Sequence, residues 1–446
     1  MDTVARAIGM DPLAFRLKNA LRPGSLTITG EVITEHHGDV VKCLQAAAQA
    51  VGYGALTAEE KARQKATGRR IGKAVVALHK APAMPPFTGT AVILKMNEDG
   101  TVSANFSLTD MGNGTYTSVA QIIAETLGFP VDRVKIPMER DTDHDPYDWQ
   151  TVASKGLMLT GNAAILACQD LITKAYDMTG QALRANVADL DHDEDGVFVK
   201  HRPGERIPFT KLACGYAYPN GSAIGGPLVG VGRYVAQGLT NLDKETGQGL
   251  PALDWTYGAH GVVAEVDPRT GEYTVLHVAS AFDVGRAVNP GQVRGQVIGG
   301  MLQGLGTATC EGYLYDQAGH LLNPNFTDNK IPTSLDLPAK VEAIVIETPQ
   351  LDGPYGVRGV GEHSMIAVGG GLGNAIYNAT GADLVRMPIR QEDVWRALEK
   401  GTEPPRIGTP ASFAAKRRTE IGAAKTDVAP VCGPGFPRHK RGARVP

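Results

Sequence analysis

One carboxylate in the second half of the sequence lies in a setting that suits acid–base chemistry. Glu362 follows Gly356, Gly359 and Gly361 in the run GVRGVGEHS. Glycine lets the backbone take conformations closed to other residues and lets a bulky partner approach closely. A carboxylate presented on such a loop is a candidate general base, which must be ionised at working pH and poorly solvated. An ordinary glycine-rich turn with a solvated glutamate would have the same pattern.

Four other groups of small and polar residues could contact a ligand. They are Gly112-Asn113-Gly114 in the run DMGNGTYT, Thr151-Val152-Ala153-Ser154, Gly291-Gln292-Val293 and Gln303-Gly304. Backbone N–H groups, amides and hydroxyls of this kind suit a large polar ligand that carries phosphate. Each group alone could be an ordinary loop. Together with Glu362 they favour a ligand site built from distant parts of the chain.

Several patterns that suggest other sites are incomplete. Asp191, Asp193, Asp195 and Gly196 match the start of a calcium-binding loop, but the twelfth position is Arg202, where a bidentate Glu is needed. We therefore interpret this stretch as an acidic hairpin turn. The glycines of VGVGRYV and GGGLGN do not complete GxGxxG. The five cysteines form no CxxC pair, which argues against an iron–sulfur cluster bound by this chain alone.

Length and composition set wider limits. A chain of 446 residues can form two or three domains with a sizeable core. A net charge of -3 gives no indication of nucleic acid or an anionic membrane as a partner. No apolar run reaches the ~18–20 residues of a membrane span, and no signal peptide is visible. We therefore expect a cytoplasmic protein, whose export to the periplasm would need a partner's signal.

The order of expected elements indicates an α+β fold. Helices are predicted after Asp11 and Asp39, and a third from Thr57, where Glu60 completes a capping box. Strands are predicted from Gly72 onward, before the DMGNG loop and a helix that follows it. A long helix over about 151–180, an acidic hairpin, and strands near 228–236 and 260–266 come next.

Glycines dominate the remaining expectations. There are 54 in the chain, well above the ~7% that is usual. Gly291, Gly295 and Gly299 recur every four residues on one face of a predicted helix. Because glycine costs helix stability, we expect this face to pack closely against another backbone. The last predicted helices are at about 365–379 and 392–398, and residues 400–446 are predicted to form a disordered tail.

With these residues in place, the sequence resembles the molybdenum-cofactor subunit of the xanthine dehydrogenase and aldehyde oxidoreductase family. The motifs that carry the resemblance are DPLAFRLKN, TDMGNGTYTSVAQIIAETLG, QTVASKGLMLTGNA, FDVGRAVNPGQVRGQVIGGMLQGLG, LLNPNF with IPTSLDLP, and GVRGVGEHS with NAIYNATG. They extend from about Asp2 to Leu398. The resemblance implies a mixed-sheet molybdenum cofactor-binding domain of the α+β class with packed, glycine-rich helices.

The resemblance also implies a domain organisation. In full-length members, a sequence like MDTVARAIGMDPLAFRLKN lies in the middle of the chain, after the first half of the cofactor subunit. Residues 1–30 would then be a remnant of the first molybdopterin-binding domain. Residues 31–399 would form the second one, as two α+β subdomains with a boundary near 245. The chain is either a naturally split subunit, whose first half is supplied by another chain, or a truncated reading frame.

Family roles carry over to the motif residues. Glu362 corresponds to the base beside molybdenum, and Gln292 to a glutamine that contacts the pterin. The segment Thr151, Val152, Ala153 and Ser154 corresponds to one that binds the cofactor. Gly112, Asn113 and Gly114 correspond to a GQG loop, with the shorter Asn in the middle position. His363 and Ser364 stand where many members have two prolines, which leaves the substrate preference open.

The resemblance implies a metal held by the dithiolene of molybdopterin, in its cytosine dinucleotide form, with no protein ligand to molybdenum. The implied reaction is oxidation of an aldehyde or an N-heterocycle, purine- or nicotinate-like, with water as the oxygen donor. Electrons would leave through an iron–sulfur subunit and, where one is present, an FAD subunit. The alternatives are a dehydroxylating subunit like those of aromatic acyl-CoA reductases, and an inactive truncated remnant.

Overall fold

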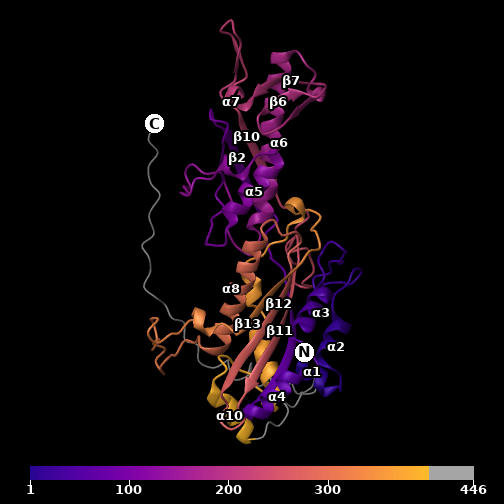
Figure 1. The fold of residues 1–446 in the computed structure, drawn as a ribbon, viewed down its shortest axis with the longest axis vertical. Coiled ribbons are helices and arrows are strands. Elements are labelled where there is room, and N and C mark those ends of the chain that lie inside the picture. Colours follow the sequence, from indigo (N-terminus) through magenta and orange to yellow (C-terminus); the bar gives the residue numbers. More distant parts are fainter. Residues whose placement is uncertain (401–446) are drawn as a thin grey trace, which may run out of the picture. The chain divides into compact units, whose positions relative to one another are not determined.

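A four-stranded mixed sheet is formed by one strand from the first half of the chain and three strands from the second half (Figure 1). Its strands, in order, are β1 (Arg70–Lys80), β11 (Thr256–Val266), β12 (Tyr273–Asp283) and β13 (Lys340–Ile346). β11 is antiparallel to β1 and β12, whereas β13 is parallel to β12. The computed structural model describes residues 1–400, so the tail predicted over 400–446 lies outside the described residues except at its first position.

Helices cover both faces of this sheet. α3 (Val40–Ala50) packs on one face, and α8 (Pro290–Thr309) and α9 (Val368–Thr380) pack on the other. Figure 1 shows β11, β12 and β13 between α3 and α8. Every residue of β11 is buried, as expected for a strand with both faces covered. The predicted α+β class with mixed sheets is confirmed.

The predicted helix starts are confirmed by their caps. Asp11 accepts a hydrogen bond from the Ala14 N–H at 2.8 Å, and Asp39 accepts one from the Lys42 N–H at 2.9 Å. Thr57 and Glu60 form a reciprocal capping box. The helices of this N-terminal region, in addition to α3, are α1 (Asp2–Ala7), α2 (Pro12–Asn19) and α4 (Ala58–Thr67).

A second mixed sheet is formed by residues between β1 and β11. Its order is β10–β2–β3–β4, with β2 at Gly89–Met96, β3 at Val102–Asn105, β4 at Val134–Lys135 and β10 at Val229–Val235. α5 (Thr115–Leu127) and the long α6 (Gly156–Leu183) share a core with it. The predicted subdomain boundary near 245 falls between β10 and β11 and stays a prediction.

The VGVGRYV glycines belong to a close contact between this sheet and α6. A Cβ at Gly230 would collide with the carbonyl oxygen of Ala167, and one at Gly232 with that of Ala163. Backbone-to-backbone approach of this kind leaves no room for a side chain. These glycines therefore serve strand–helix packing.

Short elements complete the chain. They are β5 (Leu190–His192), β6 (Gly196–Val199), β7 (Arg202–Pro208), α7 (Phe209–Leu212), β8 (Tyr216–Ala217), β9 (Ala223–Ile224) and α10 (Gln391–Lys400). The turn between β5 and β6 is the predicted acidic hairpin. In it Asp193 accepts hydrogen bonds from the N–H groups of Asp195 and Gly196 and pairs with Arg206 at 2.9 Å.

The prediction of close packing along the glycine stripe of α8 is wrong. Within residues 1–400, and apart from the backbone of α8 itself, no atom lies within 4 Å of a Cβ placed on Gly295 or Gly299. The close approach involves Gly300 and Gly304 instead, where a Cβ would collide with Ser364 and with the Met365 carbonyl. The helix is rotated so that this adjacent row faces the segment after Glu362, and spacing alone does not distinguish the two rows.

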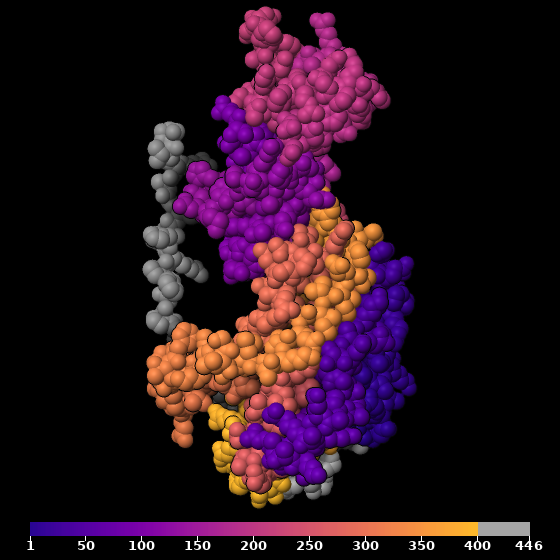
Figure 2. Space-filling view, in the orientation of Figure 1, coloured from indigo at the N-terminus to yellow at the C-terminus, as the bar shows by residue number. Residues whose placement is uncertain are grey.

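The connection from α8 to β13 lies at the surface and contains little regular structure. Figure 2 shows it as an orange lobe. Its large apolar side chains include Tyr313, Phe326 and Leu335, and Leu335 is 92% exposed. The buried Asn323 holds part of the segment in place, because its amide donates to the Gly312 carbonyl at 2.6 Å.

Candidate functional site

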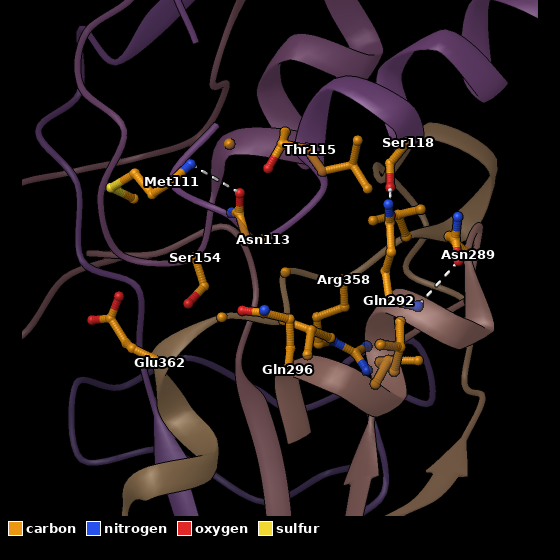
Figure 3. A pocket seen from close by; sticks show the side chains of 18 of the residues that line it. Met111, Asn113, Thr115, Ser118, Ser154, Asn289, Gln292, Gln296, Arg358 and Glu362 are labelled. Atoms are coloured by element: carbon orange, nitrogen blue, oxygen red, sulfur yellow. Dashed lines mark hydrogen bonds between the residues drawn. The ribbon is translucent and has the colours of Figure 1, made fainter. Parts of the chain in front are cut away.

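A cavity of about 640 Å³ is lined by the segments that the sequence singled out. The predicted residues that line it are Gly112, Asn113, Thr151, Val152, Ser154, Gln292 and Glu362. Figure 3 shows Asn113, Ser154, Gln292 and Glu362 around it. Gly114 and Ala153 do not line the cavity, although each neighbours a residue that does. Segments up to 250 positions apart therefore meet at one cavity.

The Gly112–Gly114 loop is held by one carboxylate. Asp110 accepts hydrogen bonds from the N–H groups of Gly112 at 2.8 Å, Gly114 at 3.2 Å and Tyr116 at 3.1 Å. Both glycines have left-handed backbone angles, with φ of 91° and 76°. Asp110 therefore fixes the loop at the start of α5 and leaves the Asn113 side chain at the cavity.

The Thr151–Ser154 segment is a strained turn just before α6. Ala153 and Ser154 have φ near 60°, which is unfavourable for residues with a side chain. The neighbouring Lys155 is buried and donates to the Gln150 carbonyl at 2.5 Å, and burial lowers the pKa of its ammonium. Thr151 adds a second anchor by accepting from the Thr109 N–H at 3.0 Å. The turn is thus held from both sides.

Gln292 joins the two helices that border the cavity. It is in the first turn of α8, where Asn289 caps the helix by accepting from the Gln292 N–H at 3.1 Å. Its side-chain oxygen accepts from the Ser118 hydroxyl of α5 at 2.8 Å (Figure 3). A Cβ on Gly114 would collide with the Gln292 amide. Gly114 therefore leaves the space that this amide occupies.

The loop that carries Glu362 is anchored by a buried ion pair that sequence reasoning missed. Arg358 and Asp283 are both fully buried, and their nearest charged atoms are 2.7 Å apart. The Arg358 guanidinium also donates to the His36 carbonyl and the Gln350 side chain, each at 2.9 Å. Both charged residues lie in motifs that carry the family resemblance, but no local pattern pairs residues 75 positions apart.

Two glycines before Glu362 let its loop touch the Ser154 turn. A Cβ on Gly359 would collide with the Ser154 carbonyl oxygen. A Cβ on Gly361 would lie 2.8 Å from the Ser154 hydroxyl. This close approach is the physical reason for glycine at both positions, and it brings two predicted site segments into direct contact.

Glu362 itself is more solvated than is expected of a general base. Its side chain is 57% exposed, because its loop lies at an open edge of the cavity. Lys80, at the end of β1, lies 3.2 Å from the Glu362 carboxylate and also donates to the Ser154 hydroxyl at 3.4 Å. The expectation of a poorly solvated base is therefore not met within residues 1–400.

Titratable groups are also buried behind this loop. His363 is fully buried, and burial, together with the charge of Lys80, lowers its pKa to about 3. Ser364 is buried and donates to the Gln296 carbonyl at 3.1 Å. Neither residue lines the cavity. Burial raises the pKa of Asp254 to about 6, although the charge of Arg358 opposes the shift.

Residues 1–400 show neither a protein-bound metal site nor a membrane span. They contain no cluster of three or more His, Cys, Asp or Glu side chains that could hold a metal ion. Among their helices, none combines the length and the apolar composition that a membrane span requires.

The chain belongs to the family of the molybdopterin cofactor-binding domain, whose model matches residues 46–338. This match covers the strands from β1 to β12 together with α5, α6 and α8, and it stops before β13 and Glu362. The family resemblance seen in the sequence is therefore confirmed.

Individual relatives agree with the family match. The chain is 28% identical over 403 residues to the gamma subunit of the 6-hydroxypseudooxynicotine dehydrogenase complex of Paenarthrobacter nicotinovorans, a match that covers 88% of this chain and 48% of the relative. It is 27% identical over 422 residues to the carbon monoxide dehydrogenase large chain of Afipia carboxidovorans, covering 90% and 50%. The chain thus spans about half the length of these relatives.

Solved structures show the same fold. Carbon monoxide dehydrogenase from Oligotropha carboxidovorans superposes with a TM-score of 0.74 at 26% identity, covering 90% of this chain and 50% of that one. Aldehyde oxidoreductase from Desulfovibrio gigas superposes with a TM-score of 0.70 at 25% identity, covering 89% and 40%.

Proposed function

We propose that this chain is the part of a molybdenum hydroxylase that binds molybdopterin and supplies the catalytic base. The observation that carries the proposal is the meeting of the Gly112, Ser154, Gln292 and Glu362 segments at one cavity. The residues present fit the cofactor. Their bare glycines leave room for a close approach, and their backbone N–H, amide and hydroxyl groups can hydrogen-bond to a pterin and its phosphate.

A second cavity supports the cytosine dinucleotide form of the cofactor. It measures about 450 Å³ and shares Arg286 and Val288 with the first cavity. The exposed Arg286 guanidinium forms no ion pair with any described residue. A free guanidinium between two cavities suits a pyrophosphate, because its planar fork matches phosphate oxygens. The nucleotide would then occupy the second cavity.

The residues of this chain would divide the work as follows. Gly112–Gly114, Thr151–Ser154 and Gln292 hold and orient the cofactor. When bound, the molybdenum cofactor supplies a two-electron oxidant that lets oxygen from water join an sp² carbon. Glu362 accepts the proton that this step releases. The substrate would be an aldehyde or an N-heterocycle, purine- or nicotinate-like, and the electrons would leave through iron–sulfur and FAD partner subunits.

The exposed parts of this chain support a partner that supplies the other half of the molybdenum subunit. Glu362 needs a cover that excludes water, because a base in the reaction must be poorly solvated. The segment from Tyr313 to Leu335 exposes several large apolar side chains to solvent. Exposed apolar surface of this kind is typical of a site that binds another protein. We infer that a separate chain covers both features.

The test is the Glu362→Gln variant in a complex co-expressed with its partner subunits. We expect turnover to fall by roughly 10²–10⁴-fold, the usual contribution of a general base, while molybdenum content stays at the wild-type level. Glu98→Gln, in an exposed turn, is the matched control. Activity retained in Glu362→Gln would remove the assignment of the base.

A further inference from the structure

We propose that Lys80 is a positioning residue that holds the Glu362 carboxylate in place at the cavity. This inference rests on the proposed function, in which Glu362 is the base. Lys80 would be a further residue of this site. No sequence motif marks it, because it ends an ordinary strand about 280 positions before the loop that it contacts.

Lys80 is well placed to act as a fixed support. It is the last residue of β1, where it pairs with Thr256 of β11 in the antiparallel ladder. Its carbonyl accepts a hydrogen bond from the Thr256 hydroxyl at 3.2 Å. Its side chain is only 17% exposed. The ammonium therefore projects from the end of a strand whose backbone is held in the main sheet.

The loop that it contacts needs such a support. Gly359 and Gly361 are required for the close approach to Ser154, and they also give the backbone before Glu362 more conformational freedom. More than half of the Glu362 side chain is exposed, so packing does not fix its rotamer. The Lys80 ammonium lies 3.2 Å from this carboxylate and 3.4 Å from the Ser154 hydroxyl. It thus links the base to a second segment of the site.

The other charged groups nearby do not compete for this role. Arg358 is already engaged with the buried Asp283. His363 is uncharged at neutral pH, because its pKa is lowered to about 3. The buried Asp254 interacts with both Arg358 and Lys80, but neither forms a direct ion pair with it within residues 1–400. Among these groups, only Lys80 pairs directly with Glu362.

An exposed surface ion pair typically contributes little, about 0–1 kcal/mol. The Lys80 pair differs, because its ammonium is largely buried and held by a strand. Its expected effect is therefore on the geometry of the base, where misplacement by about 1 Å can lower a rate by about 10²-fold. Stability and cofactor content should change little.

The experiment compares Lys80→Met, Lys80→Arg and Lys174→Met in the complex with its partner subunits. Lys174 is a matched control, since it pairs with Asp170 at 2.7 Å on α6 and does not line the cavity. The assays are steady-state kinetics with an aromatic aldehyde, hypoxanthine and nicotinate, molybdenum analysis, and hydrogen exchange of the 359–365 peptide. Exchange is measured on the chain alone and needs no activity.

We expect Lys80→Met to lower kcat by about 10- to 100-fold with KM changed less than about twofold. The 359–365 peptide should exchange faster and molybdenum content should be unchanged, whereas Lys80→Arg and Lys174→Met should behave like the wild type. Wild-type kcat or unchanged exchange in Lys80→Met would overturn the inference. If Glu362→Gln is inactive in the same complex, that result leaves the proposed function intact; if Glu362→Gln is active, the proposed function fails.

Discussion

The buried pair between Arg358 and Asp283 gives a quantitative prediction for the loop that carries Glu362. Replacing Arg358 by Met removes the cation and leaves the Asp283 carboxylate buried. Loss of one partner from such a pair typically costs about 3–5 kcal/mol. The Asp283 carboxylate also accepts hydrogen bonds from the backbone N–H groups of Asp39 at 2.9 Å and Gly285 at 3.1 Å. These remaining donors compensate in part, so we expect a cost near the lower limit, about 3 kcal/mol.

The assay is urea unfolding of the full chain, followed by tryptophan fluorescence, for the single variants and for the double variant Arg358→Met with Asp283→Asn. The double variant should be less destabilised than the sum of the singles by about 1–3 kcal/mol, because the two residues are coupled. Arg269→Met is the control: Arg269 pairs with Asp267 at 2.9 Å but is 79% exposed, so its loss should leave the urea midpoint close to that of the wild type. A cost below about 1 kcal/mol for Arg358→Met, or additive singles, would refute the reasoning.

Three further changes test other parts of the structure. Gly359→Ala should cost about 1–3 kcal/mol in thermal unfolding and reduce molybdenum content, because its Cβ would collide with the Ser154 carbonyl; unchanged values would contradict this contact. Burial raises the pKa of Asp254 to about 6, so its charge destabilises the fold increasingly as pH rises from about 4 to 6. The free energy of unfolding of Asp254→Asn, measured with urea, should therefore exceed that of the wild type by a margin that grows to about 3 kcal/mol between pH 4 and 7. A difference that does not change with pH would contradict this prediction. Gly295→Ala should stabilise the isolated chain by about 0.5–1 kcal/mol, since the added methyl group meets open space in a helix; destabilisation would show a hidden contact.

Local sequence signals predicted a large part of the fold. Helix caps such as Asp39 and the Thr57–Glu60 box depend on residues three or four positions apart, and they were found correctly. The cavity-lining segments were also recognisable, because glycines and short polar side chains cluster in each of them.

The interactions that assemble the site could not be predicted in this way. The pairs Arg358–Asp283 and Lys80–Glu362 each join residues that are far apart in the sequence and adjacent only in the folded chain. The glycine stripe shows the same limit, since its spacing defines a helix face but not what lies opposite that face. The exposure of Glu362 within residues 1–400 is likewise set by contacts between distant segments, and the local run around Gly359 and Gly361 does not indicate it.

The most direct test of cofactor binding is the metal and nucleotide content of the complex purified with its partner subunits. Molybdenum is measured by mass spectrometry, and cytidine monophosphate is measured after acid hydrolysis. We expect about one molybdenum and one cytidine monophosphate per copy of this chain, with both reduced by Gly359→Ala. A complex whose iron–sulfur subunit is fully loaded, but which contains neither molybdenum nor the nucleotide, would contradict the proposal that these segments hold molybdopterin.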